Sequence, residues 1–339
     1  MKRFLICAVA AACCYVASAD ARAGFTIGDI YATYNELHDE NAVAHYDSTG
    51  AYLGSIAMPA TSIYGSTRGL GFGPDGLLYV VQDQLHQDAK FNLVDQVGVL
   101  AFDSTGALKE SYTYTGTGSN MNNISYGKIS FDASGHFFVG AGGGLLEFTE
   151  GSPGSGSLVF PTSNYGVFDV KTLANGHMLV ASAYDIYELD GSGHVVRDLT
   201  QAENGANPYR FVDLRGLEYD ASTGVLYASM LSDSSHYFQV MKIDYATGAL
   251  LGAKTFTYAD DLFLGADGRL LVGSRTQTPI FLDKDLNSLG SFSSAAGPRM
   301  FVTQFGPAAV AAVPEPASFA MLGVGVATIL AAARSRRTR

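Results

Sequence analysis

Six charged residues stand at corresponding places along the sequence, and their side chains are of the types that bind polar ligands. Each lies at or near the start of an apolar stretch that leads into a glycine-containing turn. The six are Arg68, Lys128, Asp169, Arg215, Asp260 and Asp261. Carboxylates alone would suit a divalent cation, but three neighbouring cations oppose metal binding. The set therefore predicts a polar ligand-binding surface and no metal site.

Two of these residues belong to a tripeptide that occurs twice, as Arg68-Gly69-Leu70 and Arg215-Gly216-Leu217. A guanidinium group is a planar fork of donors that suits carboxylates and sugar hydroxyls. We therefore expect the charged residues to ring one mouth of a central channel. The alternative is that they form ion pairs between repeats and bind no ligand.

The sequence contains no recognisable catalytic constellation. None of the seven histidines falls in an H-E-x-x-H or H-x-H arrangement. The three cysteines, Cys7, Cys13 and Cys14, all lie near the start of the chain. The remainder has no thiol for nucleophilic catalysis, metal ligation or disulfides. We predict no catalytic residue, no metal and no cofactor.

Two recurring phrases predict the elements that carry these residues. The first is an apolar strand, a turn with Asp or Asn and Gly, and a second apolar strand; its five copies are Phe72–Val80, Phe131–Val139, Thr172–Val180, Tyr219–Ala228 and Leu264–Val272. The second phrase has six copies: Val43–Tyr52, Val99–Leu108, Leu145–Gly151, Ile186–Val195, Val240–Leu250 and Ile280–Leu289. Their turns supply the positive φ angles that tight hairpins require. Each pair of phrases predicts a four-stranded antiparallel sheet.

The phrases define six sheets, of which the first lacks its opening strand. Ile30–Tyr34 is predicted as its second strand, and one unpaired apolar segment, Met300–Phe305, follows the sixth sheet. That segment would complete the first sheet and close a ring. Residues 24–306 are therefore predicted to form an all-β, six-bladed β-propeller closed by a C-terminal strand.

The pattern of Leu70–Val80 with Val99–Gly106 resembles the repeats of NHL-type and related six-bladed propellers. The resemblance covers residues 25–306 and implies the fold, because such propellers have many unrelated activities. Small-molecule lactonases on similar propellers hold a divalent metal over the central channel. A metal-dependent lactonase or hydrolase is therefore the alternative function.

The first 23 residues have the order of a secretory signal peptide. Lys2 and Arg3 precede an apolar stretch, and small residues follow it up to Ala23. We predict cleavage after Ala23 and export across the cytoplasmic membrane. A lipoprotein signal at Cys13 is the alternative.

Residues 307–339 are predicted to be a linker and a sorting segment. Val313, Pro314, Glu315 and Pro316 precede the uncharged run Ala317–Ala333, and four arginines follow it. A run of 17 residues is just long enough for a membrane-spanning helix, and the arginines favour the cytoplasmic side. This order resembles the PEP-CTERM signal, which implies transient anchoring and an exosortase and the export machinery as partners.

The charge of the body limits its partners. Of 21 basic residues, seven lie in the two ends, which leaves 14 against 31 of the 32 acidic residues and a formal net charge of −17. Such a body repels nucleic acid. Our hypothesis is an exported, non-enzymatic binding or structural protein of the cell surface or extracellular polysaccharide matrix. Its partners would be extracellular polysaccharide or envelope proteins, and a protein-interaction platform remains a further alternative.

Overall fold

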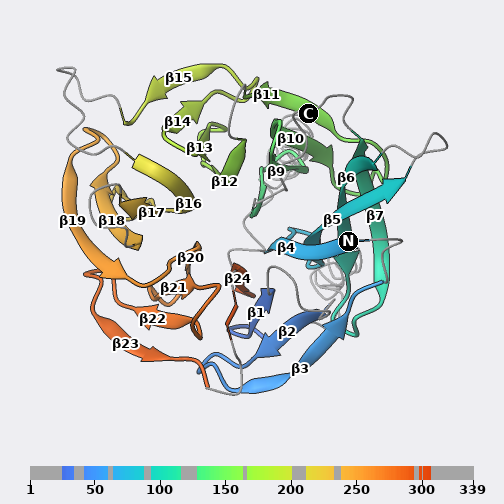
Figure 1. Ribbon diagram of the computed structural model, residues 1–339, viewed down its shortest axis with the longest axis horizontal. Helices are drawn as coiled ribbons and strands as arrows, with labels where there is room; N and C mark the ends of the chain where they lie inside the picture. The colour runs from blue at the N-terminus through green and yellow to red at the C-terminus, as the bar shows by residue number, and fades with distance from the viewer. Residues whose placement is uncertain are drawn as a thin grey trace, which may run out of the picture.

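The computed structural model describes residues 25–33, 42–59, 64–87, 93–115, 128–162, 166–200, 211–232, 238–293, 298–299 and 301–306. Within these ranges the strands form six four-stranded antiparallel sheets, and no helix is present. The sheets stand like blades around a common axis (Figure 1). The predicted six-bladed propeller is confirmed.

Each blade has an innermost strand, called a, followed outward by strands b, c and d. Blade 1 consists of β24 (Phe301–Gln304), β1 (Ile30–Thr33), β2 (Ala42–Tyr46) and β3 (Tyr52–Ala57). Blade 2 consists of β4 (Tyr64–Phe72), β5 (Leu78–Gln87), β6 (Leu93–Phe102) and β7 (Leu108–Thr115). Blade 3 consists of β8 (Ile129–Phe131), β9 (His136–Ala141), β10 (Gly144–Thr149) and β11 (Ser157–Pro161).

The second half of the ring continues in the same order. Blade 4 consists of β12 (Val167–Thr172), β13 (Met178–Ser182), β14 (Ile186–Leu189) and β15 (Val195–Asp198). Blade 5 consists of β16 (Phe211–Asp220), β17 (Val225–Ser232), β18 (Phe238–Asp244) and β19 (Leu250–Phe256). Blade 6 consists of β20 (Asp261–Leu264), β21 (Leu270–Gly273), β22 (Ile280–Leu282) and β23 (Ser288–Ser291).

The ring is closed by hydrogen bonds between the first and last strands in the sequence. β24 pairs antiparallel with β1, so that Ile30 lies opposite Gln304 and Thr33 lies opposite Phe301. All four residues of β24 are buried. The predicted closure by Met300–Phe305 is confirmed, and the strand itself runs from Phe301 to Gln304.

The hairpin turns explain why the repeats are visible in the sequence. In the turn between β2 and β3, the Asp47 carboxylate accepts the backbone N–H groups of Thr49 and Ala51. Gly50 in the same turn has a φ angle of 85°, which a residue with a Cβ atom adopts only at a cost. Equivalent aspartates accept backbone N–H groups in other c–d turns: Asp103, Asp190 and Asp283.

One face of the ring carries all of these turns. Neighbouring strands in each blade are antiparallel, so the a–b and c–d turns of every blade lie at the face where the innermost strands end. We call this the turn face. The b–c turns and the connections between blades lie at the opposite face.

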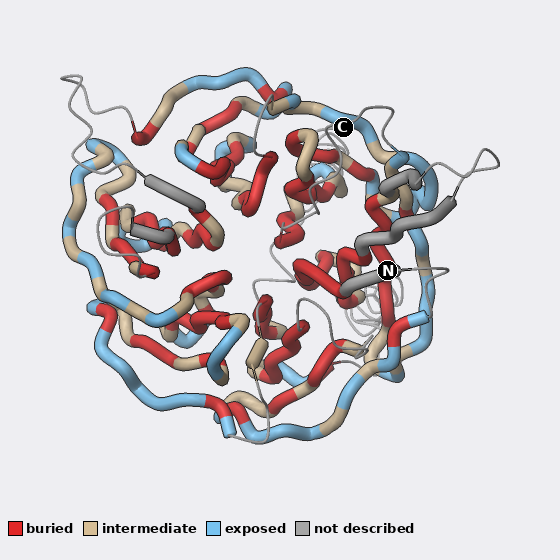
Figure 2. The backbone as a smooth tube through the Cα atoms, in the orientation of Figure 1, coloured by how far each residue is buried: buried red, intermediate tan, exposed pale blue. Residues whose placement is uncertain are grey.

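Apolar side chains fill the spaces between adjacent blades. Buried residues follow the inner strands and exposed residues follow the outermost strands (Figure 2). Between blades 2 and 3, the ring of Phe137 lies 5.2 Å from Tyr79 and 5.0 Å from Tyr112, measured between ring centroids. The Phe137–Tyr112 pair is edge-to-face, and aromatic pairs of this kind stabilise the packing beyond the area that they bury.

The two predicted targeting segments lie outside the described residues. These are the signal peptide, residues 1–23, and the linker and sorting segment, residues 307–339. In the part of the chain that the structure describes, no helix is long and apolar enough to cross a membrane. The described residues therefore all belong to the propeller.

The closing strand leads to a prediction about stability. Phe301 is 3% exposed and packs in the core between blades 1 and 2. We expect Phe301→Ala to lower the free energy of unfolding by about 3–5 kcal/mol, because it removes a buried aromatic side chain and leaves a cavity. Urea unfolding of the purified propeller measures this change.

Leu289→Ala is the matched control, because Leu289 lies on outer strand β23 and is 56% exposed. Its effect should stay within about 0.5 kcal/mol. Equal effects of the two substitutions would show that β24 does not hold the ring closed.

Candidate binding cavity on the propeller axis

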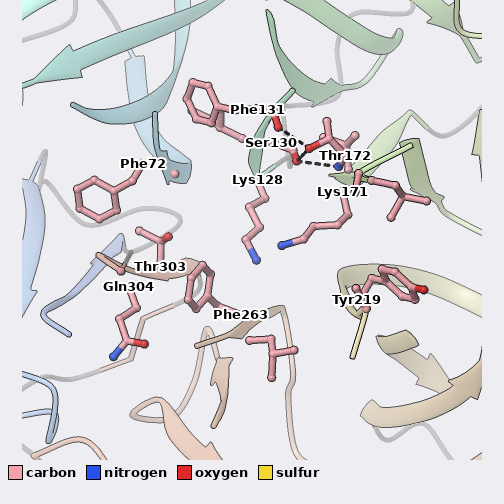
Figure 3. Close-up of a pocket in the computed structure, with 18 of the residues that line it drawn as sticks. Phe72, Lys128, Ser130, Phe131, Lys171, Thr172, Tyr219, Phe263, Thr303 and Gln304 are labelled. Atoms are coloured by element: carbon pink, nitrogen blue, oxygen red, sulfur yellow. Dashed lines mark hydrogen bonds between the residues drawn. The ribbon is translucent and has the colours of Figure 1, made fainter. Parts of the chain in front are cut away.

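A cavity of about 680 Å³ opens on the propeller axis at the turn face, and all six blades contribute to its wall. The carboxyl ends of the innermost strands and the a–b turns form this wall. Its lining includes aromatic and polar residues from every blade: Phe72, Lys128, Phe131, Lys171, Tyr219, Phe263, Thr303 and Gln304. Lys128 and Lys171 point toward the centre of the cavity, whereas the rings of Phe72, Phe131 and Tyr219 turn outward into the packing between blades (Figure 3). Its volume lies in the ordinary range for small-ligand sites.

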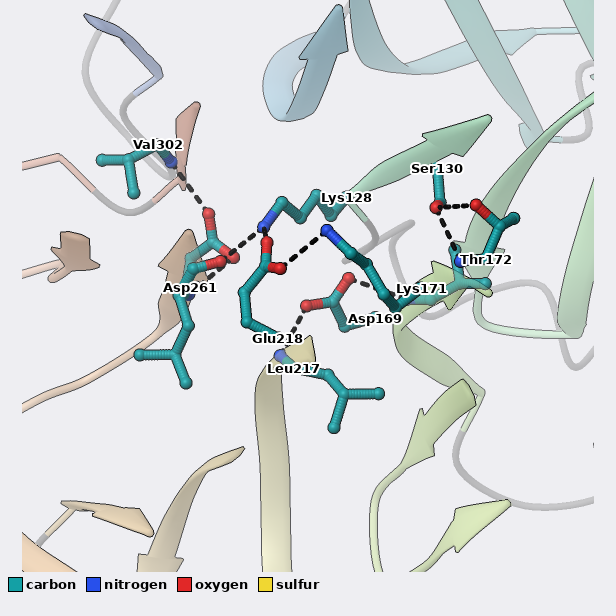
Figure 4. Close-up of polar contacts among 11 residues, drawn as sticks. Lys128, Ser130, Asp169, Lys171, Thr172, Leu217, Glu218, Asp261 and Val302 are labelled. Atoms are coloured by element: carbon teal, nitrogen blue, oxygen red, sulfur yellow. Dashed lines mark hydrogen bonds and ion pairs between the residues drawn. The ribbon is translucent and has the colours of Figure 1, made fainter. Parts of the chain in front are cut away.

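Two lysines and one glutamate form the polar centre of the cavity. Lys128 precedes β8 and is 5% exposed; its ammonium group donates to the Glu218 carboxylate and to the carbonyl oxygen of Leu262. Lys171 on β12 pairs with the same carboxylate, with 2.7 Å between Nζ and Oε2. Glu218 on β16 is fully buried. One carboxylate thus joins lysines from two other blades (Figure 4).

The charges of this centre stabilise one another. Burial opposes the charge on Lys128, but Glu218, Asp261 and Asp169 outweigh burial and raise the pKa of Lys128 above its ordinary value. Burial likewise opposes ionisation of Glu218, yet the two lysines hold the pKa of Glu218 below its ordinary value. Both groups therefore stay charged at neutral pH.

Asp169 and Asp261 connect neighbouring blades through hydrogen bonds. Asp169 accepts the backbone N–H of Val170 at 2.7 Å and that of Leu217, in the next blade, at 2.6 Å. Asp261 accepts the N–H of Leu262 and that of Val302, in the next blade, each at 2.8 Å. The same side chain type thus joins blade 4 to blade 5 and blade 6 to blade 1.

The carboxyl groups of Asp169 and Asp261 are almost fully buried, and burial raises their pKa values. Burial raises the pKa of Asp261 to about 6, while Lys128 and the N–H of Val302 oppose that rise. Burial also raises the pKa of Asp169, helped by repulsion from Asp261 and Glu218 and opposed by Lys128.

Of the six charged residues named from the sequence, Lys128 alone lines the cavity. Asp260, Arg68 and Arg215 lie outside the charged centre around it. Asp260 accepts the backbone N–H of Arg275 at 2.7 Å and its Nε at 2.9 Å. Arg68 is 3% exposed, and its carbonyl oxygen accepts the hydroxyl of Thr33. The guanidinium carbon of Arg215 lies 5.4 Å from the ring centroid of Phe168.

The structure thus brings together Lys128, Asp169 and Asp261 from the predicted set and adds Glu218 and Lys171, which sequence reasoning missed. Lys171 lies two residues after Asp169, and side chains two apart on a strand share a face. Glu218 lies three residues after Arg215 on β16. A second charged residue two or three positions after a predicted site residue was therefore the available signal.

Residues 312–337 match the PEP-CTERM protein-sorting motif. The chain carries a PEP-CTERM sorting signal. The resemblance stated for Val313, Pro314, Glu315 and Pro316 is confirmed, and the signal implies export, transient membrane anchoring and processing by an exosortase.

Solved structures share the fold of this PEP-CTERM protein at low identity. A protein of unknown function from Bacteroides caccae is 18% identical with a TM-score of 0.50; the match covers 69% of this chain and 80% of that one. A chain of a nidogen/laminin complex is 13% identical with a TM-score of 0.57, over 82% of this chain and 97% of that one. A gluconolactonase from Xanthomonas campestris is 13% identical with a TM-score of 0.42, over 72% and 89% of the two chains.

The two likenesses with TM-scores of 0.50 and 0.57 show the propeller fold alone, because propellers of one shape have unrelated activities. No curated protein sequence matches the chain. Among the residues that the structure describes, no three His, Cys, Asp or Glu side chains gather so that they could hold a metal ion.

The raised pKa of Asp261 predicts how the stability of the PEP-CTERM protein depends on pH. The folded state prefers the protonated acid, so stability is greatest below the ordinary aspartate pKa near 4 and falls as the pH rises through about 6. We expect Asp261 to contribute a fall of the order of 3 kcal/mol across this window. Urea unfolding between about pH 4 and pH 7 measures it.

Asp261→Asn should reduce this fall, because the amide does not ionise. Asp285→Asn is the matched control, since Asp285 is exposed in a c–d turn and its side chain is 81% accessible. An unchanged pH dependence in Asp261→Asn would contradict the assignment.

Proposed function

We propose that the propeller is an exported, non-enzymatic glycan-binding domain that acts at the cell surface or in the extracellular polysaccharide matrix. The observation that carries this proposal is the axial cavity, which combines aromatic walls with ammonium and hydroxyl donors. Sugar rings have apolar faces that pack on aromatic side chains and hydroxyls that accept hydrogen bonds.

The charge balance of the cavity favours a neutral sugar over an anion. Glu218 neutralises part of the charge of Lys128 and Lys171, and Asp169 and Asp261 lie beside them. The side chain of Lys171 remains 31% exposed, so its ammonium can donate to a ligand hydroxyl. The net charge of −17 on the body also disfavours acidic polymers.

The carboxylates at the axis already have partners, which supports binding over hydrolysis. Asp169 and Asp261 each accept two backbone N–H groups, and Glu218 is held by two lysines. A general base must be free to take a proton from a bound substrate or water. These three acids are instead part of the contacts between blades.

The sorting signal supports the location. A chain that is exported and transiently anchored reaches the outside of the cytoplasmic membrane, where extracellular polysaccharide and envelope proteins are its available partners. The exosortase acts on the tail, while the cavity belongs to the propeller.

The proposal predicts selective binding through Lys171. We expect the purified propeller, residues 24–306, to bind a neutral polysaccharide from the producing cells and to bind an acidic polysaccharide more weakly. Lys171→Met should weaken binding by about tenfold or more, because it removes one charged donor and keeps the length of the side chain. Isothermal titration calorimetry measures both affinities.

Lys109→Met is the matched control, because Lys109 lies on outer strand β7 with its side chain 48% exposed. Its affinity should equal that of the unmodified protein. No binding to any polysaccharide would overturn the glycan assignment, and release of product from lactones or glycans with added calcium would establish the hydrolase alternative. A discrete crosslinked envelope protein would support the interaction platform instead.

A further inference from the structure

The axial cavity is not symmetric, because it continues outward between blades 4 and 5. On blades 2 and 3, the described residues that line the cavity end with the innermost strands, at Phe72 and Phe131. On blades 4 and 5, the lining continues into the turns that follow the strands: Leu173, Ala174, Asn175, Ala221 and Tyr245. We call these five residues the side arm of the cavity.

The side arm extends well beyond the innermost strand. Tyr245 directly follows β18, which is strand c of blade 5, and belongs to the c–d turn. Two strand spacings of about 4.8 Å separate strands a and c, so the side arm adds roughly 10 Å to the length of the cavity. A single sugar ring is shorter than the cavity and its side arm together. The site therefore has room for a short chain of sugar residues.

The side arm combines apolar area with hydrogen-bond donors. Leu173 of blade 4 and Tyr219 and Tyr245 of blade 5 pack on the core between these blades and stay partly accessible. The side-chain amide of Asn175 is exposed, and its oxygen accepts the backbone N–H of His177 at 3.0 Å. The amide nitrogen carries two N–H donors. Such a surface suits the apolar faces and the hydroxyls of sugar rings.

Several contacts hold Tyr245 in place at the outer end of the side arm. The guanidinium carbon of Arg197 lies 4.6 Å from the Tyr245 ring centroid, and the Tyr219 ring lies 4.8 Å from it. Burial and a hydrogen bond to the Glu188 carboxylate raise the pKa of Tyr245 above its ordinary value. Glu188 also accepts Arg197 Nη2 at 2.9 Å. A ring that is fixed before binding loses little entropy when a ligand packs on it.

The charged centre closes the propeller axis below the cavity. Because the innermost strands run toward the turn face, Glu218 lies deeper than Tyr219, the next residue, which lines the cavity. Lys128 reaches from blade 3 to the Glu218 carboxylate of blade 5 and to the Leu262 carbonyl oxygen of blade 6, so its side chain crosses the axis (Figure 4). Lys128 and Glu218 are both buried. A polymer therefore cannot thread through the propeller along this axis.

Aromatic rings fill the junction between blades 1 and 2, on the far side of the axis from the side arm. Phe72 and Tyr219 lie on opposite sides of the cavity (Figure 3). The ring of Phe72 lies 4.9 Å from Phe25 and 4.8 Å from Phe305, measured between centroids. Phe25 and Phe72 are buried. A chain that begins in the cavity thus finds its path along the turn face through the side arm.

We propose that the cavity binds one end of a neutral, linear glycan chain, and that the next sugar residues lie in the side arm between blades 4 and 5. The terminal sugar contacts Lys171 at the axis, where the lysine side chain is 31% exposed. The residues that follow contact Asn175 and Tyr245. This inference rests on the proposed glycan function and names the part of the polymer that is recognised. Each propeller then caps a single chain.

Binding stoichiometry tests whether the site takes a chain end. The neutral polysaccharide of the producing cells is cut by partial acid hydrolysis, separated by chain length and titrated into the full-length protein in detergent solution. Isothermal titration calorimetry should give one bound protein per glycan chain for every length. The affinity should rise over the first few sugar residues and then stay constant. A number of bound proteins that grows with chain length would overturn end binding.

Two matched tryptophan substitutions test the side arm. Ala174 and Ala266 occupy the same position in the a–b turns of blades 4 and 6, because each follows the residue whose carbonyl oxygen accepts the N–H of the turn glycine. Both are exposed and both line the cavity, but Ala266 lies outside the side arm. Ala174→Trp should weaken binding of the longer chains by about tenfold or more, because the indole fills the side arm, and should leave binding of the monosaccharide unchanged.

Ala266→Trp should change the affinity for either ligand by less than about twofold. Equal losses in the two variants, or a larger loss in Ala266→Trp, would overturn the side arm as the path of the chain. Urea unfolding checks that both variants are folded. Absence of binding of any fraction to the unmodified protein would reject the glycan function itself, whereas binding that fails either test rejects this inference alone.

Discussion

Charge compensation at the propeller axis is the constraint on which the centre of this molecule depends. Six innermost strands converge on a small space, and a charge buried there without a partner would cost several kcal/mol. Glu218 meets this constraint by pairing with Lys128 and Lys171. Asp169 and Asp261 accept backbone N–H groups of the next blade, and burial still raises the pKa of both carboxyl groups. The residues that form the charged centre are therefore also residues that connect the blades.

The same arrangement determines what is left for a ligand. The cavity lining presents Lys171 together with the ring of Phe263, while the buried carboxylates of Glu218, Asp169 and Asp261 are held by the contacts between blades. A surface of this kind has donors and apolar area but little net charge. The cavity therefore suits a neutral, hydroxyl-rich ligand, although the surface of the whole body is acidic.

The fold could be predicted from the sequence because its rules are local. An aspartate and a glycine at fixed spacing define each hairpin turn, as at Asp47 and Gly50, and counting the turns gave the number of blades. The closing strand followed from one unpaired apolar segment. The partners of Lys128 could not be predicted in this way, because Glu218 is 90 residues away in sequence. Their contact depends on how blades 3 and 5 are placed around the axis, which no local pattern records.

Ring closure also sets the timing of folding during export. β1 emerges from the membrane early, but its partner β24 is separated from it by most of the chain. Until β24 arrives, blade 1 presents an unpaired strand edge, and long-range pairing of this kind is slow and prone to aggregation. Blade 1 is therefore complete only after the last strand of the propeller has been made.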